Sequence, residues 1–336
     1  MKLADASASI FKRDAILYTV NFLTSILISR KLGLTALGIW SILQIISSYA
    51  ECFGRTRIEL AAVYYIGNKR YTKEDVLASI NMTILITSIF ILILGLTNLE
   101  LIHELLFNKI ETNQIKEIAL MIISIPLSFM YTSYSYFFIA IEDIDTYNRI
   151  VIIFTIVLSS TSILLLTLTN LGLMAIISSY VFAPFIASLY ALFSLPKNII
   201  SNGIHSYKIT LSLLKYGLQF YITSILNELQ RSSTRLITAY LMNPGFVAFI
   251  AQGQKIALIQ ERIVSPIQTT LLPKISSSSS EKALKITLKA FRISSLILFI
   301  ASIFILMLIK PLVVLVYGKE FAPIAKVIII ILPGLF

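Results

Sequence analysis

Long apolar runs, separated by short polar segments, make up most of the chain. A membrane-spanning helix needs roughly 20 mostly apolar residues, and runs of that length recur from residue 15 almost to the end of the sequence. The pattern predicts an all-α protein that crosses a membrane many times. The expected spans cover residues 15–30, 36–54, 76–97, 117–140, 150–169, 172–194, 216–241, 246–266 and 292–309, and a further span begins near Ala325.

The segment 55–75 is too polar to cross a membrane, but it has a pattern of its own. Its apolar residues recur at helical spacing, which predicts an amphipathic helix on the inner surface of the membrane. These apolar residues are Ile58, Ala61, Ala62, Tyr65 and Ile66.

Composition supports the membrane class and excludes others. Hydrophobic residues make up 57% of the chain and charged residues 13%, whereas a typical soluble domain carries about 25% charged residues. The single cysteine, Cys52, excludes a disulfide framework, and the two histidines, His103 and His205, are too far apart in sequence to suggest a metal site. We therefore expect no metal and no cofactor.

The net charge of +11 is explained by topology rather than by a nucleic-acid partner. Cytoplasmic loops of membrane proteins collect Lys and Arg. If the N-terminus is inside, most basic residues fall in inside segments, among them 55–75 and 267–290, while 98–116 lies outside. The count predicts a cytoplasmic N-terminus.

An internal repeat is indicated when the chain is shifted on itself by roughly 208 residues. Lys73-Glu74 then falls on Glu281-Lys282, and Pro126 falls near Pro333. Two parallel repeats of six helices are expected, with residues 1–208 forming the N-terminal bundle. Residues 209–336 supply about four of the six helices of the second bundle, so we expect a truncated product or part of a longer protein.

Four segments carry a resemblance to a known family. They are Arg30–Gly33 with Gly38, Lys215-Tyr216-Gly217-Leu218, Leu271–Ser276, and Val316–Phe321 continuing to Leu332-Pro333-Gly334. In order and spacing they resemble the bacterial polysaccharide or O-antigen flippases (Wzx-type) of the multidrug/oligosaccharidyl-lipid/polysaccharide exporter superfamily. Phe246 departs from the pattern, since it stands where Gly38 stands in the first half.

The resemblance implies a MATE-like fold in the bacterial cytoplasmic (inner) membrane. It also implies alternating-access transport of a polyprenyl-pyrophosphate-linked oligosaccharide repeat unit to the periplasmic leaflet, for O-antigen, lipopolysaccharide or capsule. The expected partners are the lipid-linked oligosaccharide, membrane lipids and other polysaccharide assembly proteins.

A cluster of polar residues in the span 216–241 is the strongest candidate for substrate binding. Glu228, Arg231 and Arg235 share one helix face, with Asn227 beside it. Charges at membrane depth are costly and usually face a cavity or a partner. An excess of arginine there suits a pyrophosphate, although a plain Glu228–Arg231 ion pair is the alternative.

Further charged candidates lie in other spans. Lys255 and Arg262 in the span 246–266 add positive charge to the expected cavity, unless Arg262 extends to the inner surface. Asp14 and Glu51 are the acids that could take up a coupling cation, or they pair with Arg13 or Arg55.

Two other functions remain open from the sequence. A cation-coupled multidrug exporter of the same fold predicts an apolar, acidic pocket, which the Arg-rich span 216–241 disfavours. A membrane enzyme of the polysaccharide pathway requires acid/base or metal-binding residues grouped in a large loop, and the loop 98–116 offers only a weak pair, so we do not expect the protein to be an enzyme.

Overall fold

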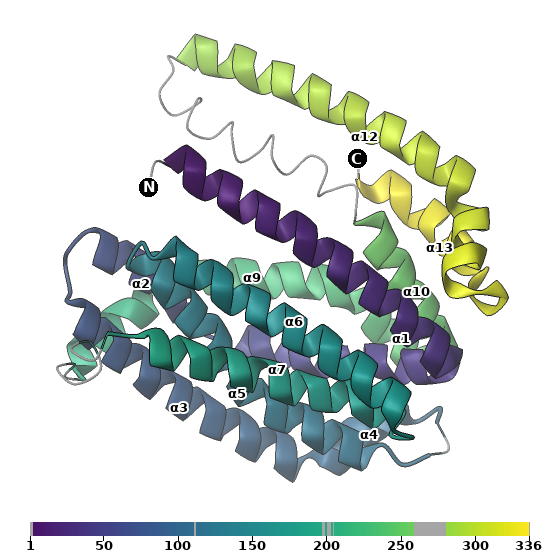
Figure 1. Cartoon of the computed structure of the whole chain (residues 1–336), viewed down its shortest axis with the longest axis horizontal. Helices are drawn as coiled ribbons and strands as arrows, with labels where there is room; N and C mark the ends of the chain where they lie inside the picture. The colour runs from purple at the N-terminus through teal and green to yellow at the C-terminus, as the bar shows by residue number, and fades with distance from the viewer. Residues whose placement is uncertain are drawn as a thin grey trace. The chain divides into compact units, whose positions relative to one another are not determined.

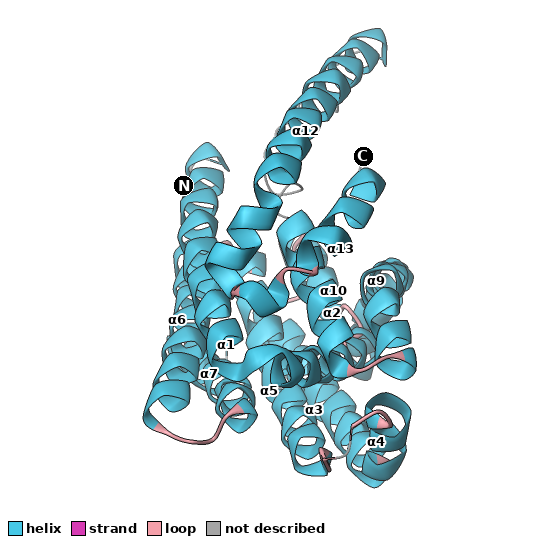
Figure 2. Cartoon of the chain, turned by 90° about the vertical axis from the view of Figure 1, so that its right-hand side faces the viewer, coloured by secondary structure: helices cyan, strands magenta, loops and turns pink. Residues whose placement is uncertain are grey.

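The computed structural model describes residues 3–110, 112–196, 199, 203, 205–258 and 280–335, and every regular element within these ranges is a helix (Figures 1 and 2). Seven of the helices described are long and apolar enough to cross a membrane, which confirms the predicted all-α membrane protein. The helices are α1 (Leu3–Gly54), α2 (Ile58–Gly67), α3 (Lys73–Thr97), α4 (Leu99–Phe107), α5 (Ile115–Ala140), α6 (Ile144–Leu168), α7 (Leu173–Ser194), α9 (Tyr207–Leu241), α10 (Pro244–Ala257), α12 (Ser280–Tyr317) and α13 (Ile324–Ile331), with short 3₁₀ turns at Lys319–Phe321 and Leu332–Leu335.

By its contacts the chain forms two compact units, Met1–Pro244 and Gly245–Phe336. This division reflects packing and does not test the repeat boundary at residue 208, which stays a prediction.

In the first unit, α1 consists of two helices that meet at Gly33. The backbone there has φ 74° and ψ 178°, a conformation that glycine adopts without steric cost. The helical hydrogen bonds are therefore interrupted at Gly33. This residue lies in the short connection that the sequence predicts between the spans 15–30 and 36–54. The second arm is the better buried one, and Leu37, Leu43 and Ile45 are almost completely enclosed.

Helix α7 packs closely against α5 and α6. Every fourth residue along one face is small, so the backbones of neighbouring helices can approach, as is common in membrane bundles. The face comprises Ala175, Ser179, Ala183, Ala187 and Ala191, all fully buried.

The predicted helix in the segment 55–75 is present as α2. Its apolar face is buried as expected, but it packs against α5 and α9, so protein rather than lipid covers it. Glu59 lies on the same buried face, which the sequence interpretation did not anticipate.

Helix α9 packs on α1, α2, α3 and α4. Gly217 allows this close approach, because a Cβ there would lie 2.6 Å from the carbonyl oxygen of Thr56. The junction between α1 and α2 is thereby held directly against the first half of α9.

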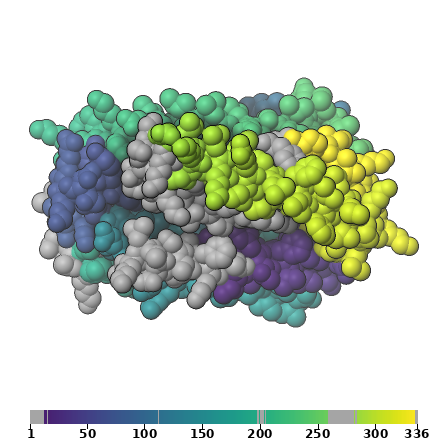
Figure 3. All heavy atoms as spheres, turned by 90° about the horizontal axis from the view of Figure 1, so that it is seen from above, coloured from purple at the N-terminus to yellow at the C-terminus, as the bar shows by residue number. Residues whose placement is uncertain are grey.

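In the second unit, α12 and α13 pack on each other. The surface of α12, yellow-green in Figure 3, carries large exposed apolar side chains such as Phe291, Phe299 and Phe304. Exposed apolar surface of this extent is typical of a helix that faces lipid. The predicted span 246–266 begins in α10, and its part after residue 258 lies outside the described residues.

The predicted orientation is tested by single cysteines in a Cys52→Ser background. Lys69, in the turn after α2, and Asn108, after α4, are both exposed. With a cytoplasmic N-terminus, Asn108→Cys should react with an impermeant maleimide in intact cells and Lys69→Cys only after permeabilisation. Equal labelling of both residues in intact cells would contradict the orientation.

Candidate functional site

A polar cavity of about 120 Å³ lies among the end of α1, the start of α2 and the middle of α9. Its lining carries both signs of charge and two serine hydroxyl groups. The lining residues are Ser48, Glu51, Cys52, Arg55, Arg57, Ser224 and Glu228.

Glu51 is placed at this cavity by the second arm of α1. Its Oε1 accepts a hydrogen bond of 2.6 Å from the hydroxyl of Ser128 on α5. A single hydroxyl donor leaves the carboxylate with acceptor capacity for a ligand. The sequence prediction of Glu51 as a functional acid stays a prediction, and the structure gives it a position at a cavity.

Two arginines and a buried glutamate form an ion-pair cluster at the α1–α2 junction. The Glu59 side chain is fully buried, and its Oε1 lies 3.1 Å from Arg55 Nε and 3.6 Å from Arg57 Nη1. Buried carboxylates require such partners, because an unpaired charge away from water is very costly. Glu59 therefore fixes where both guanidinium groups lie.

Arg57 also connects the junction to α9. Its Nε donates a hydrogen bond of 2.7 Å to the hydroxyl of Ser224. Its backbone is left-handed, with φ 57°, a conformation uncommon for a residue other than glycine. Residues with a strained backbone are concentrated at functional sites. The left-handed conformation therefore makes Arg57 the strongest candidate for a functional role among the cavity residues.

On α9 the predicted polar face is present but differently arranged. Ser232 donates a hydrogen bond to Glu228, and Arg235 Nη2 donates one of 2.9 Å to Ser232. Glu228 and Arg235 are thus linked through a hydroxyl. Arg231 and Asn227 are exposed and are not among the residues that line the cavity.

The remaining predicted site residues are Asp14, Lys255 and Arg262. Asp14 forms an ion pair of 2.7 Å with Arg13, whose guanidinium also donates to Asn148 at 2.7 Å. Lys255 is exposed on α10 in the second unit, and Arg262 lies outside the described residues. The structure therefore places neither Lys255 nor Arg262 relative to the cavity.

Sequence reasoning missed the roles of Arg55, Arg57 and Glu59. The two arginines were counted as topological charges of an inside loop, and Glu59 was not considered. A signal was present, since Arg55 and Glu59 are four residues apart and Glu59 falls among the apolar positions of a predicted helix. No group of three or more His, Cys, Asp or Glu side chains suited to a metal ion occurs in the part of the chain that the structure describes.

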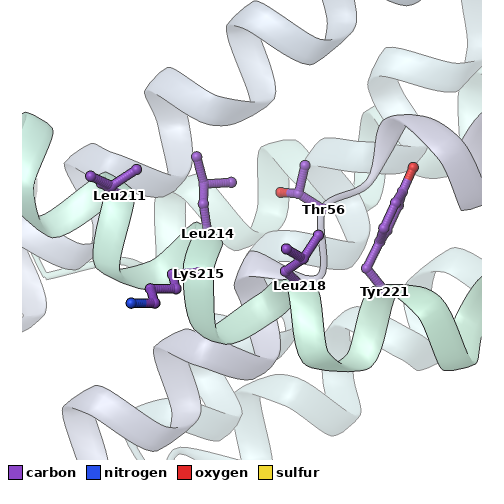
Figure 4. A pocket seen from close by; sticks show the side chains of 6 residues that line it. All are labelled: Thr56, Leu211, Leu214, Lys215, Leu218 and Tyr221. Atoms are coloured by element: carbon purple, nitrogen blue, oxygen red, sulfur yellow. The ribbon is translucent and has the colours of Figure 1, made fainter.

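An apolar groove of about 480 Å³ runs along the first half of α9 (Figure 4). Tyr221, at one end of it, donates a hydrogen bond of 2.9 Å to the backbone oxygen of Phe53, which ties this part of α9 to the end of α1. The groove is lined by Thr56, Leu211, Leu214, Lys215, Leu218 and Tyr221.

Residues 27–326 match the family model described as polysaccharide biosynthesis protein. The chain belongs to this family. No curated protein matches the chain in sequence.

Solved structures share the fold of this family member. An inward-facing multidrug resistance MATE family transporter of the MOP superfamily has a TM-score of 0.73 and 15% identity, over 94% of this chain and 76% of that one. An outward-facing MATE family transporter has a TM-score of 0.60 and 14% identity, over 96% of this chain and 74% of that one. The predicted MATE-like fold is confirmed.

Proposed function

We propose that this protein is a transporter that moves a polyprenyl-pyrophosphate-linked oligosaccharide from the cytoplasmic to the periplasmic leaflet of a bacterial inner membrane. The observation that carries the proposal is the family match over residues 27–326, because it connects a membrane protein to polysaccharide synthesis. The likeness to transporters in inward-facing and outward-facing states supports alternating access as the mechanism.

The cavity chemistry suits such a head group. A pyrophosphate with attached sugars cannot cross hydrocarbon without a polar route. Guanidinium groups bind phosphate oxygens through two parallel hydrogen bonds, which Arg55 and Arg57 offer from the cavity wall. The carboxylates of Glu51 and Glu228 accept hydrogen bonds from sugar hydroxyls. In the proposal, the head group uses this lining while the lipid chain stays in the apolar phase.

A cation-coupled multidrug exporter is the second candidate. It is favoured by one observation, namely that two carboxylates, Glu51 and Glu228, line the same small cavity, where a cation is readily bound. In that case the cavity carboxylates would be essential for drug efflux, and surface polysaccharide would not depend on the protein.

The proposal is tested by complementation in a strain that lacks its own flippase, with surface polysaccharide as readout and membrane level measured in parallel. The wild-type protein is expected to restore polysaccharide, and Arg235→Ala to abolish it, because Arg235 is linked to the cavity residue Glu228 through Ser232. Arg235→Lys should restore only part, since lysine lacks the fork geometry.

Two further variants on α9 are compared with Arg235→Ala in the same assay. Glu228→Gln should be milder than Arg235→Ala, because it removes a counter-charge but keeps the shape of the side chain and leaves the guanidinium group of Arg235 in place. Arg231→Ala is expected to be as severe as Arg235→Ala if both arginines bind the pyrophosphate. Because Arg231 is exposed and does not line the cavity, a normal result for this variant alone would remove Arg231 from the site. Normal polysaccharide from the Arg231→Ala/Arg235→Ala double variant would exclude both arginines from the transport route.

A different outcome would favour the multidrug exporter. In that case the wild-type protein would restore drug resistance but not surface polysaccharide, and Glu51→Gln would abolish this resistance.

A further inference from the structure

The polar cavity is smaller than the head group that it is proposed to pass. Its volume is about 120 Å³, whereas sites for small molecules occupy about 300–1,000 Å³. A pyrophosphate that carries several sugars does not fit into a space of this size. If the cavity is the route of transport, its walls must therefore move apart during the transport cycle.

Helix α9 is the wall of the cavity that is held most weakly. The opposite wall, at the end of α1, is fixed inside the bundle, because Glu51 accepts the hydrogen bond from Ser128 and a Cβ at Gly54 would lie 2.7 Å from the ring of Phe129. Among the seven candidate spans described, α9 has the smallest buried share, 11% of its most apolar 18 residues. Elements with few buried contacts separate at the lowest cost, so α9 is the wall that moves.

On one side of the cavity, α9 contacts the α1–α2 junction at Gly217. A Cβ at this position would lie 2.6 Å from the carbonyl oxygen of Thr56. The neighbouring Tyr216 stacks on Tyr64 of α2, with ring centroids 4.4 Å apart. Gly217 comes two helical turns, about 10 Å, before the cavity residue Ser224. With a cytoplasmic N-terminus, this contact closes the cavity toward the inner surface.

On the other side of the cavity, α1 contacts the turn that follows α9. A Cβ at Gly38 would overlap the carbonyl oxygen of Pro244 and would lie 2.8 Å from the Cβ of that residue. Both residues belong to the first unit. Gly38 comes about 15 Å before the cavity residue Ser48 along α1, so this contact lies across the cavity from Gly217.

We propose that the two glycine contacts are the gates of the polar cavity, the inner gate at Gly217 and the outer gate at Gly38. In this arrangement both gates are closed, and the cavity is opened to one surface when α9 separates from α1 and α2 at one gate while the other holds. The inference rests on the proposed function, since it takes the cavity as the route of transport, and it adds the two places where this route opens.

The native Cys52 tests the gates, because it lines the cavity and is only 6% exposed. The rate of its reaction with an impermeant maleimide is measured on the full chain in inside-out and in right-side-out membrane vesicles. Gly217→Ala should raise the rate from the inner face alone, and Gly38→Ala from the outer face alone. In each case the added methyl group meets backbone atoms, which cannot rotate away from it. The expected rise is about tenfold, which corresponds to about 1.4 kcal/mol of strain in the closed gate.

Gly67→Ala is the matched control for both variants. It adds the same methyl group at the end of α2, where a Cβ meets nothing within 4 Å, and Cys52 should then react as slowly as in the wild type.

A second pair of variants tests the inner gate without adding a methyl group. Tyr216→Ala removes the ring that stacks on Tyr64, so Cys52 should react faster from the inner face. Tyr216→Phe keeps the stacked ring and should behave as the wild type does. This pair decides the inner gate even if Gly217→Ala fails to reach the membrane.

Faster labelling of Gly217→Ala and Gly38→Ala from the same face, or of either variant from both faces equally, would show general loosening and overturn the gates. Unchanged labelling of Gly217→Ala and Tyr216→Ala would overturn the inner gate. Complementation of surface polysaccharide by the wild-type protein is scored separately. The gates can therefore fail while the proposed function stands, and failed complementation with the expected labelling would overturn the proposed function alone.

Discussion

Arg57→Asn is expected to reduce export of lipid-linked oligosaccharide about tenfold or more, because a charge-assisted hydrogen bond contributes about 1.5–3 kcal/mol and each 1.4 kcal/mol is about tenfold. Asparagine tolerates the left-handed backbone at this position, so the variant removes the guanidinium without adding backbone strain. Glu59 keeps its partner Arg55 at 3.1 Å, and the fold is expected to persist. The measurement is the rate of surface polysaccharide appearance, normalised to the amount of protein in the membrane.

The matched control for this variant is Arg149→Asn. Arg149 is exposed on α6 and lines neither the cavity nor the groove, so its loss should leave export unchanged. Arg57→Lys should recover part of the rate, since the charge returns without the two-pronged geometry. Export by Arg57→Asn at the wild-type rate would remove Arg57 from the route of the head group.

Glu59→Ala is expected to cause the largest loss of stability, about 3–5 kcal/mol in the free energy of unfolding, as for other buried pairs that lose one partner. The variant leaves the guanidinium groups of Arg55 and Arg57 close together without their shared carboxylate. The measurement is unfolding of the purified protein in detergent, followed by circular dichroism.

An ion pair of the same spacing on α12 provides the control. Glu281 contacts Lys285 at 2.7 Å, but both side chains are largely exposed, and exposed pairs contribute about 0–1 kcal/mol. Glu281→Ala should therefore unfold almost as the wild type does. The Arg55→Gln/Glu59→Gln double variant should recover part of the stability lost on Glu59→Gln alone, because the cation and the carboxylate are then removed together. Equal stability of Glu59→Ala and Glu281→Ala would contradict the structural role of Glu59.

The membrane class and most spans were predictable, because continuous apolar runs are a local property of the sequence. The break at Gly33 was predictable for the same reason, since the connection between the spans 15–30 and 36–54 falls there. The polar face of α9 was predictable from the spacing of Glu228, Arg231 and Arg235. Each of these features depends on residues within a few helical turns of one another.

The cavity itself was not predictable, because it is made by contacts between distant segments. The Ser128–Glu51 hydrogen bond joins residues 77 positions apart, and the Arg57–Ser224 hydrogen bond joins residues 167 positions apart. The periodicity of apolar residues predicts the helix α2 itself, but it does not predict that α2 packs against α5 and α9. The sequence therefore predicted charged residues at membrane depth, Arg231 and Arg235 among them, which stay predictions, and it did not single out Arg57, which lines the cavity.

The central claim, movement of a lipid-linked oligosaccharide through the cavity at Arg57, is tested most directly with purified full-length protein in sealed vesicles. Lipid-linked oligosaccharide is placed in both leaflets, and an impermeant periodate reagent oxidises the sugars that reach the outer surface. The account predicts that the wild-type protein exposes the inner-leaflet pool to the reagent with time, and that Arg57→Asn leaves this pool protected. An inner pool that stays protected with the wild-type protein, or that moves equally fast with Arg57→Asn, would contradict it.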